Sequence, residues 1–114
     1  MPMATKTTMV QYKTTEAYGD ANHAAIRAVF AELRRRGTRG VRYACHRLPD
    51  GVTFVHIATF QSPAEGPHPI TSLPAFEAFQ AGLKGNTVTP PLVTELHPFE
   101  TYGDDVASTG DIER

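Results

Sequence analysis

Apolar and polar residues follow the two-residue period of a β-strand along several stretches of the chain. Residues 7–15 (TTMVQYKTT) are rich in β-branched side chains and contain neither Gly nor Pro, a composition typical of strands. The runs 41–48 (VRYACHRL) and 52–60 (VTFVHIATF) flank a Pro-Asp-Gly segment whose residues favour a tight turn. The pattern therefore predicts a first strand and, later in the chain, a β-hairpin.

Two other stretches repeat their apolar residues with helical spacing. Between Asp20 and Gly37 apolar side chains recur every three or four residues, which predicts an amphipathic helix with Asp20 as its N-cap. A shorter helix is predicted after Ser72, which is the candidate N-cap, with Pro74 in its first turn and an end at residues 85–86.

The remaining segments complete one domain. Residues 61–72 contain three prolines and are predicted to be a loop. Residues 92–99 (LVTELHPF) again favour extended backbone, and Pro98 places the end of this strand at a sheet edge. We expect a domain over residues 7–103, with a flexible N-terminus (1–6) and a polar C-terminal tail (104–114).

This β-α-β-β-α-β order predicts an α+β fold, a ferredoxin-like antiparallel sheet with both helices on one face. The other face of the sheet is then bare. The hairpin strands carry apolar residues at both parities, such as Phe54 beside Val55, so burial of both faces is expected. The chain is therefore expected to form a homodimer through the bare sheet face.

The turn of the hairpin determines which side chains share a face. A type I turn closed by a glycine bulge would place Leu48 opposite residues 51–52. In that register one face carries a cationic and aromatic group: Arg42, His46, Phe54, His56 and Phe60. A two-residue turn would shift the pairing by one and bring Cys45 opposite His56. We predict the bulged register and keep the shifted one as the alternative.

Composition and charge narrow the classes of partner. The chain of 114 residues is 40% apolar and 20% charged, as expected of one folded domain. Eleven Lys and Arg against twelve Asp and Glu create no basic field, so nucleic acid is not expected as a partner. No apolar run is long enough to span a membrane. The single cysteine and the polar N-terminus favour a cytoplasmic protein.

Histidines are the main candidates for chemistry. His46 and His56 could relay protons or ligate a metal, and a hydrogen-bonded, partly buried pair is the plainer interpretation. The five histidines are scattered, without an HxH or HExxH motif, so no metal site is expected. Cys45 is interpreted as a small buried residue, because a reactive thiol would need His56 beside it.

The segments FVHIATFQS, SLPAFEAFQAGL and LVTELHPFETYG, in this order, resemble the antibiotic biosynthesis monooxygenase-like family of the dimeric α+β barrel superfamily. The resemblance spans roughly residues 7–103. It implies two ferredoxin-like sheets that face each other in a dimer, and a cavity between the sheet and helices of each monomer. Some members oxidise quinols or polyphenols without a cofactor, others degrade haem, and many have no known activity.

The resemblance implies a cofactor-free monooxygenase-like enzyme that acts on a small aromatic or quinol-type substrate. A histidine often precedes the second helix in this family, and His68 is the nearest match. The candidate catalytic residues are Arg42, His46, His56 and His68, and the candidate pocket residues are Tyr12, Phe54, Phe60, Phe76 and Phe79. No cofactor is expected. The alternatives are a non-catalytic dimeric module that binds a small aromatic or apolar ligand, and a protein that binds or degrades haem.

Overall fold

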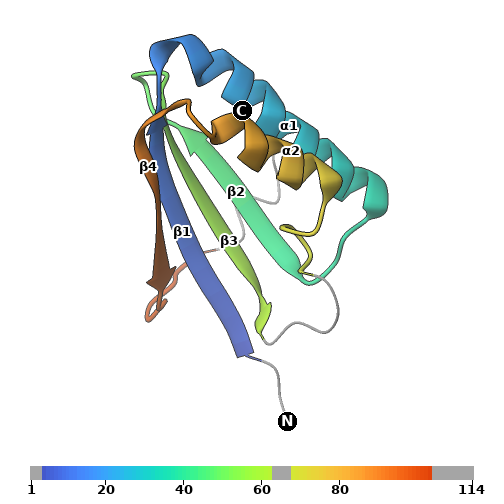
Figure 1. The fold of residues 1–114 in the computed structure, drawn as a ribbon. Helices are drawn as coiled ribbons and strands as arrows, with labels where there is room; N and C mark the ends of the chain where they lie inside the picture. The colour runs from blue at the N-terminus through green and yellow to red at the C-terminus, as the bar shows by residue number, and fades with distance from the viewer. Residues whose placement is uncertain (1–3, 63–67, 104–114) are drawn as a thin grey trace.

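A four-stranded antiparallel sheet carries two helices on one face (Figure 1). The computed structural model describes residues 4–62 and 68–103. The elements are β1 (Ala4–Thr14), a 3-10 turn (Glu16–Tyr18), α1 (Gly19–Arg36), β2 (Val41–Arg47), β3 (Thr53–Ser62), α2 (Pro74–Leu83) and β4 (Thr87–Leu96). The strand order is β2-β3-β1-β4. This arrangement confirms the predicted α+β ferredoxin-like fold.

The outer parts of the sheet extend further than predicted. β1 begins at Ala4, which pairs with Ser62 of β3, so residues 4–6 are strand and not a flexible terminus. β4 begins at Thr87, and both Pro90 and Pro91 lie inside it. Prolines are tolerated there because β4 is an edge strand, as predicted for this part of the chain. Residues 1–3, residues 63–67 of the predicted loop and the predicted tail 104–114 lie outside the described residues.

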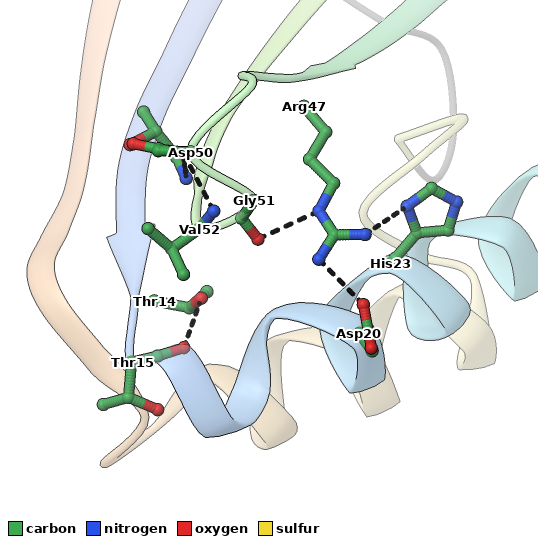
Figure 2. Close-up of polar contacts among 9 residues, drawn as sticks. Thr14, Thr15, Asp20, His23, Arg47, Asp50, Gly51 and Val52 are labelled. Atoms are coloured by element: carbon green, nitrogen blue, oxygen red, sulfur yellow. Dashed lines mark hydrogen bonds and ion pairs between the residues drawn. The ribbon is translucent and has the colours of Figure 1, made fainter.

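The N-terminus of α1 is fixed by the β2–β3 turn, and the predicted Asp20 cap is wrong. Tyr18 occupies the N-cap position without a side-chain hydrogen bond. Arg47 extends from the end of β2 and donates to Asp20 Oδ1 at 2.9 Å and to the Gly51 carbonyl at 2.9 Å (Figure 2). It also donates to His23 Nδ1 at 3.2 Å. The helix begins one residue before Asp20, so Asp20 lies within the first turn and its carboxylate pairs with the guanidinium group.

The N-terminus of α2 is likewise held by another element. Leu73 is the N-cap, and Ser72 instead donates its hydroxyl to the His68 carbonyl, so the predicted Ser72 cap is wrong. The backbone N–H of Ala75 donates to Glu32 Oε1 of α1 at 3.0 Å. A buried carboxylate on α1 thus satisfies an N–H group that the first turn of a helix leaves without an intrahelical partner.

The hairpin register differs by one residue from the predicted bulged register. Cys45 lies opposite His56, and Arg47 lies opposite Phe54. The Leu48 N–H donates to the Thr53 carbonyl at 2.9 Å. Side chains alternate between the two faces of a strand. His56 and Phe54 of β3 face the helices, as do their partners Cys45 and Arg47 in β2. The intervening β2 residues, including His46, lie on the other face of the sheet.

Asp50 gives the physical reason for this register. Its Oδ1 accepts the backbone N–H groups of both Val52 and Thr53 at 2.9 Å, and its Oδ2 accepts the Thr53 hydroxyl at 2.6 Å. The Val52 N–H is therefore taken within the turn and does not pair across the hairpin. An aspartate side chain that binds the backbone two residues later is a common competitor of the strand ladder.

The hydrophobic core fills the space between the sheet and the helices. It is built from side chains of β1, β3, both helices and the segment before α2: Tyr12, Ile26, Val29, Phe54, Leu73, Phe79 and Leu83. In the part of the chain that the structure describes, neither helix has the length and apolar character needed to cross a membrane.

Candidate functional site

A cavity of about 290 Å³ lies between the helix-facing side of the sheet and α2. Its wall is largely apolar, with Phe60, Phe76, Phe79, Val10 and Val93 among the contributing side chains. A larger, more open groove of about 870 Å³ runs between α1 and β2. We place the candidate site in the smaller cavity because buried polar groups of three strands converge there.

His56 is the centre of this polar group. Its Nε2 lies 2.7 Å from the Tyr12 hydroxyl of β1, and its Nδ1 lies 2.8 Å from the Tyr43 hydroxyl of β2. Cys45 Sγ also lies 3.1 Å from Nδ1. The observed register brings these side chains to one face of three adjacent strands, so both ring nitrogens of His56 have partners.

A helix completes the group from the other side. Asn22, in the first turns of α1, is fully buried and donates through Nδ2 to the Tyr12 hydroxyl at 2.9 Å. Its Oδ1 has no hydrogen-bond partner among the described residues. Aromatic packing holds both phenol rings, since Tyr12 stacks on Phe54 at 5.6 Å and Tyr43 stacks on Phe30 at 4.9 Å between ring centroids.

Burial keeps these titratable groups uncharged. Loss of hydration lowers the pKa of His56 to about 4, with the nearby His46 as a smaller cause, and raises the pKa of Cys45 to about 12. The pKa values of both Tyr12 and Tyr43 are raised for the same reason. At neutral pH the site is therefore a set of neutral hydrogen-bonding groups. Cys45 lies beside His56 but remains a protonated thiol, which is not the reactive form.

His68 contributes a second polar position to the cavity wall. Its Nδ1 accepts the backbone N–H groups of Ile70 at 3.0 Å and Thr71 at 3.2 Å. A neutral imidazole carries one proton, so the proton lies on Nε2. The ring packs edge-on against Phe60 with centroids 4.7 Å apart, and partial burial lowers the pKa of His68.

The structure brings only some of the predicted site residues together. The cavity wall includes six of them, namely Tyr12, His56, Phe60, His68, Phe76 and Phe79. Arg42 and His46 pair with Thr59 and Val55 on the opposite face of the sheet and are exposed there. The expected grouping of these two residues with His56 is wrong because the hairpin register is shifted. Phe54 is buried under the Tyr12 ring and borders the larger groove instead.

Asn22 was not among the residues predicted for the site, and Tyr43 was not predicted to lie beside His56. A signal for Asn22 was present, because it lies four residues before Ile26 on the apolar side of the predicted helix. A polar residue at such a position needs a buried partner. The role of Tyr43 depends on the hairpin register, which the sequence left open. Among residues 4–62 and 68–103 there is no cluster of three or more His, Cys, Asp or Glu side chains that could hold a metal ion.

Comparisons with known proteins agree with the fold. No family model matches the sequence, and no curated protein matches it. Among solved structures, Rv0793 from Mycobacterium tuberculosis aligns with a TM-score of 0.69 at 18% identity, over 88% of this chain and 100% of that one. PA3566 from Pseudomonas aeruginosa aligns with a TM-score of 0.68 at 18% identity, over 88% and 100% of the two chains.

A third similar structure comes from Nitrosomonas europaea and carries the provisional name antibiotic biosynthesis monooxygenase. It aligns with a TM-score of 0.69 at 12% identity, over 90% of this chain and 98% of that one. The chain thus belongs to the ferredoxin-like α+β class and shares the fold of structures bearing this monooxygenase name. The resemblance predicted from the sequence is confirmed at the level of the fold.

Proposed function

We propose that this protein binds a small aromatic substrate with a hydroxyl group, a phenol or a quinol, and promotes its oxidation by dioxygen without a cofactor. The observation that supports this most is the neutral Tyr12, His56 and Tyr43 group on the wall of an otherwise apolar cavity. The provisional monooxygenase name of structures with this fold supports the same class of reaction.

The reaction needs dioxygen as its oxidant. The substrate hydroxyl loses its proton to solvent, and the resulting anion gives one electron to dioxygen. The two radicals combine to form a peroxide anion at a ring carbon that carried hydrogen, and this anion takes up a proton from solvent to become a hydroperoxide. Loss of water then leaves a quinone carbonyl, so one oxygen atom enters the product and the other leaves as water. Hydrogen-bond donors on the cavity wall would stabilise the anion, and the phenyl rings would exclude water.

The size of the cavity and the state of His56 favour this reading over haem chemistry. A volume of about 290 Å³ lies at the small end for ligand sites, which suits one small aromatic molecule. A haem iron requires an axial ligand, whereas both nitrogens of His56 already have hydrogen-bond partners. A cofactor-free reaction requires no metal ligand from these residues.

Oxygen uptake with quinol and anthrone-type compounds tests the proposal. We expect uptake to be faster with the protein than without it, and one atom of labelled dioxygen to appear in the quinone product. His56→Gln should remove most of the acceleration, while His46→Gln, on the opposite face of the sheet, should keep it. Binding of these compounds without faster uptake would overturn the enzymatic proposal and favour a ligand-binding module.

A further inference from the structure

The direction of the hydrogen bonds around His56 can be followed from Asn22 outward. An amide NH2 group only donates, and that of Asn22 donates to the Tyr12 hydroxyl oxygen at 2.9 Å. The Tyr12 proton is then available for the other polar atom within reach, His56 Nε2 at 2.7 Å. Nε2 must accept this bond, so it carries no proton.

The far side of the imidazole ring faces Tyr43 and Cys45. A neutral imidazole with an unprotonated Nε2 carries its proton on Nδ1. That N–H faces the Tyr43 oxygen at 2.8 Å, with the weaker acceptor Cys45 Sγ at 3.1 Å. Tyr43 therefore accepts from His56, and its own proton is shared only with the weak acceptor Cys45 Sγ, which a ligand oxygen can replace as the stronger acceptor. Tyr43 lies on the cavity wall, and its ring is held by stacking on Phe30.

We infer that Asn22 orients the chain of hydrogen bonds Asn22, Tyr12, His56, Tyr43 so that it ends in a donor, and that the cavity selects aromatic ligands with an anionic or carbonyl oxygen. Asn22 is a positioning residue in this scheme, since it acts through Tyr12 and His56. The inference deepens the proposed function, because a donor at this place holds a phenolate or enolate more tightly than the neutral hydroxyl compound.

His68 supports the same specificity from a separate element. Its Nδ1 accepts two backbone N–H groups, which leaves Nε2 as the protonated nitrogen of the neutral ring. His68 and Tyr43 both line the cavity. The lining residues that the structure describes include these two neutral donors and no Asp or Glu, which favours a ligand oxygen that accepts hydrogen bonds.

Nitrogen-15 NMR of the unmodified protein tests the direction of the chain without any variant. At neutral pH we expect the His56 resonances of a tautomer with Nδ1 protonated and Nε2 unprotonated. Asn22→Leu, which cannot donate, should change the tautomer ratio of His56, whereas Tyr102→Phe, at a fully exposed position, should not. Protonation of Nε2 in the unmodified protein would overturn the inference, because it would mean that Asn22 presents its oxygen to Tyr12 and that the chain runs the opposite way.

Binding of a nitrophenol tests the ligand class independently of oxidation. This probe resists oxidation and can be compared below and above its own pKa, at pH values where His56 stays neutral. We expect tighter binding of the nitrophenolate than of the nitrophenol, and a loss of roughly ten- to a hundredfold in nitrophenolate affinity for Tyr43→Phe, as for a hydrogen bond to a charged group. Asn22→Leu should lose part of this preference, although Asn22 does not line the cavity.

An unchanged preference for the anion in Tyr43→Phe would overturn the inference. The outcome is separate from that of the oxygen-uptake experiment. A protein that prefers the nitrophenolate but leaves quinols unoxidised would retain this inference and lose the proposed reaction.

Discussion

His56 couples the candidate site to the stability of the protein. Burial lowers its pKa from 6.5 to about 4 in the folded state, so the folded protein rejects a proton that the unfolded chain accepts between these values. The free energy of unfolding should therefore have its full value above about pH 6.5 and decrease as the pH drops toward 4. The loss of stability caused by this one group reaches about 3 kcal/mol at pH values below both pKa values.

Urea unfolding at pH 7.5 and pH 4.5 measures this effect, with an NMR titration of the His56 ring to locate its pKa. We expect the loss of stability on acidification to be smaller in His56→Gln than in the unmodified protein. Thr94→Gln is the control, because it replaces an exposed residue of the opposite sheet face and leaves His56 and its hydrogen bonds in place. A His56 titration centred near pH 6.5 would contradict the prediction.

At the scale of single residues, the sequence identified His56 but not its surroundings. Residue type and spacing were enough to select it, together with several aromatic residues of the cavity wall. Its partners depend on a register that differs by one residue between two plausible turns, and the choice rests on three hydrogen bonds to the Asp50 carboxylate. The role of Asn22 can be recognised only when α1 is packed on β1, because its partner Tyr12 lies in that strand.

At the scale of elements, close contact between α1 and the hairpin depends on Gly19. Its backbone is ordinary helix, with φ −57°, so conformation does not require glycine there. A methyl group at this position would place its carbon 2.5 Å from the Gly51 carbonyl oxygen and 3.0 Å from Arg47 Nη2. Gly19→Ala should therefore destabilise the protein by roughly 1–3 kcal/mol, the usual cost of overpacking.

Chemical denaturation checks this prediction, and the rest of the helix offers a control. Ala21 is exposed in the same first turn, and Ala21→Gly should cost only the helix propensity of about 1 kcal/mol. Because alanine is the better helix former, a Gly19→Ala protein as stable as the parent would show that the helix and the turn can separate at little cost. The proposed close approach would then be unimportant.

The elements themselves were predictable because hydrophobic period and Gly or Pro punctuation act within a few residues. Their ends were less predictable, because partners distant in the sequence decide them. Asp20 binds Arg47 instead of capping α1. The Ala75 N–H in the first turn of α2 is bound by Glu32, 43 residues earlier in the chain. The Ala75 N–H and two arginines of α1 stabilise the ionised Glu32 and lower its pKa. No pattern in the sequence around Ser72 indicates this contact between the two helices.

At the scale of the whole molecule, one face of the sheet has no covering layer in the described chain (Figure 1). The register aligns Thr94, Met9, Ile57 and Ala44 in one row across this face. Large apolar side chains are also exposed on and after β4, with Leu92 67% exposed and Phe99 91% exposed. Exposed apolar side chains beside an uncovered sheet face are features of an interaction site.

We propose that a second copy of the chain covers this face, so the protein should have about twice the monomer mass of 12.4 kDa in solution. Ile57→Lys would place a charge in the middle of this sheet face and should yield monomers in light-scattering measurements after size-exclusion chromatography. Thr94→Lys, at an exposed position of the same row, should weaken the dimer without harming the folded monomer. Glu77→Lys, on an exposed part of α2, should remain dimeric.

A monomeric parent protein at micromolar concentration, or a dimer that tolerates both open-face lysines, would show that another surface or another partner covers the apolar residues.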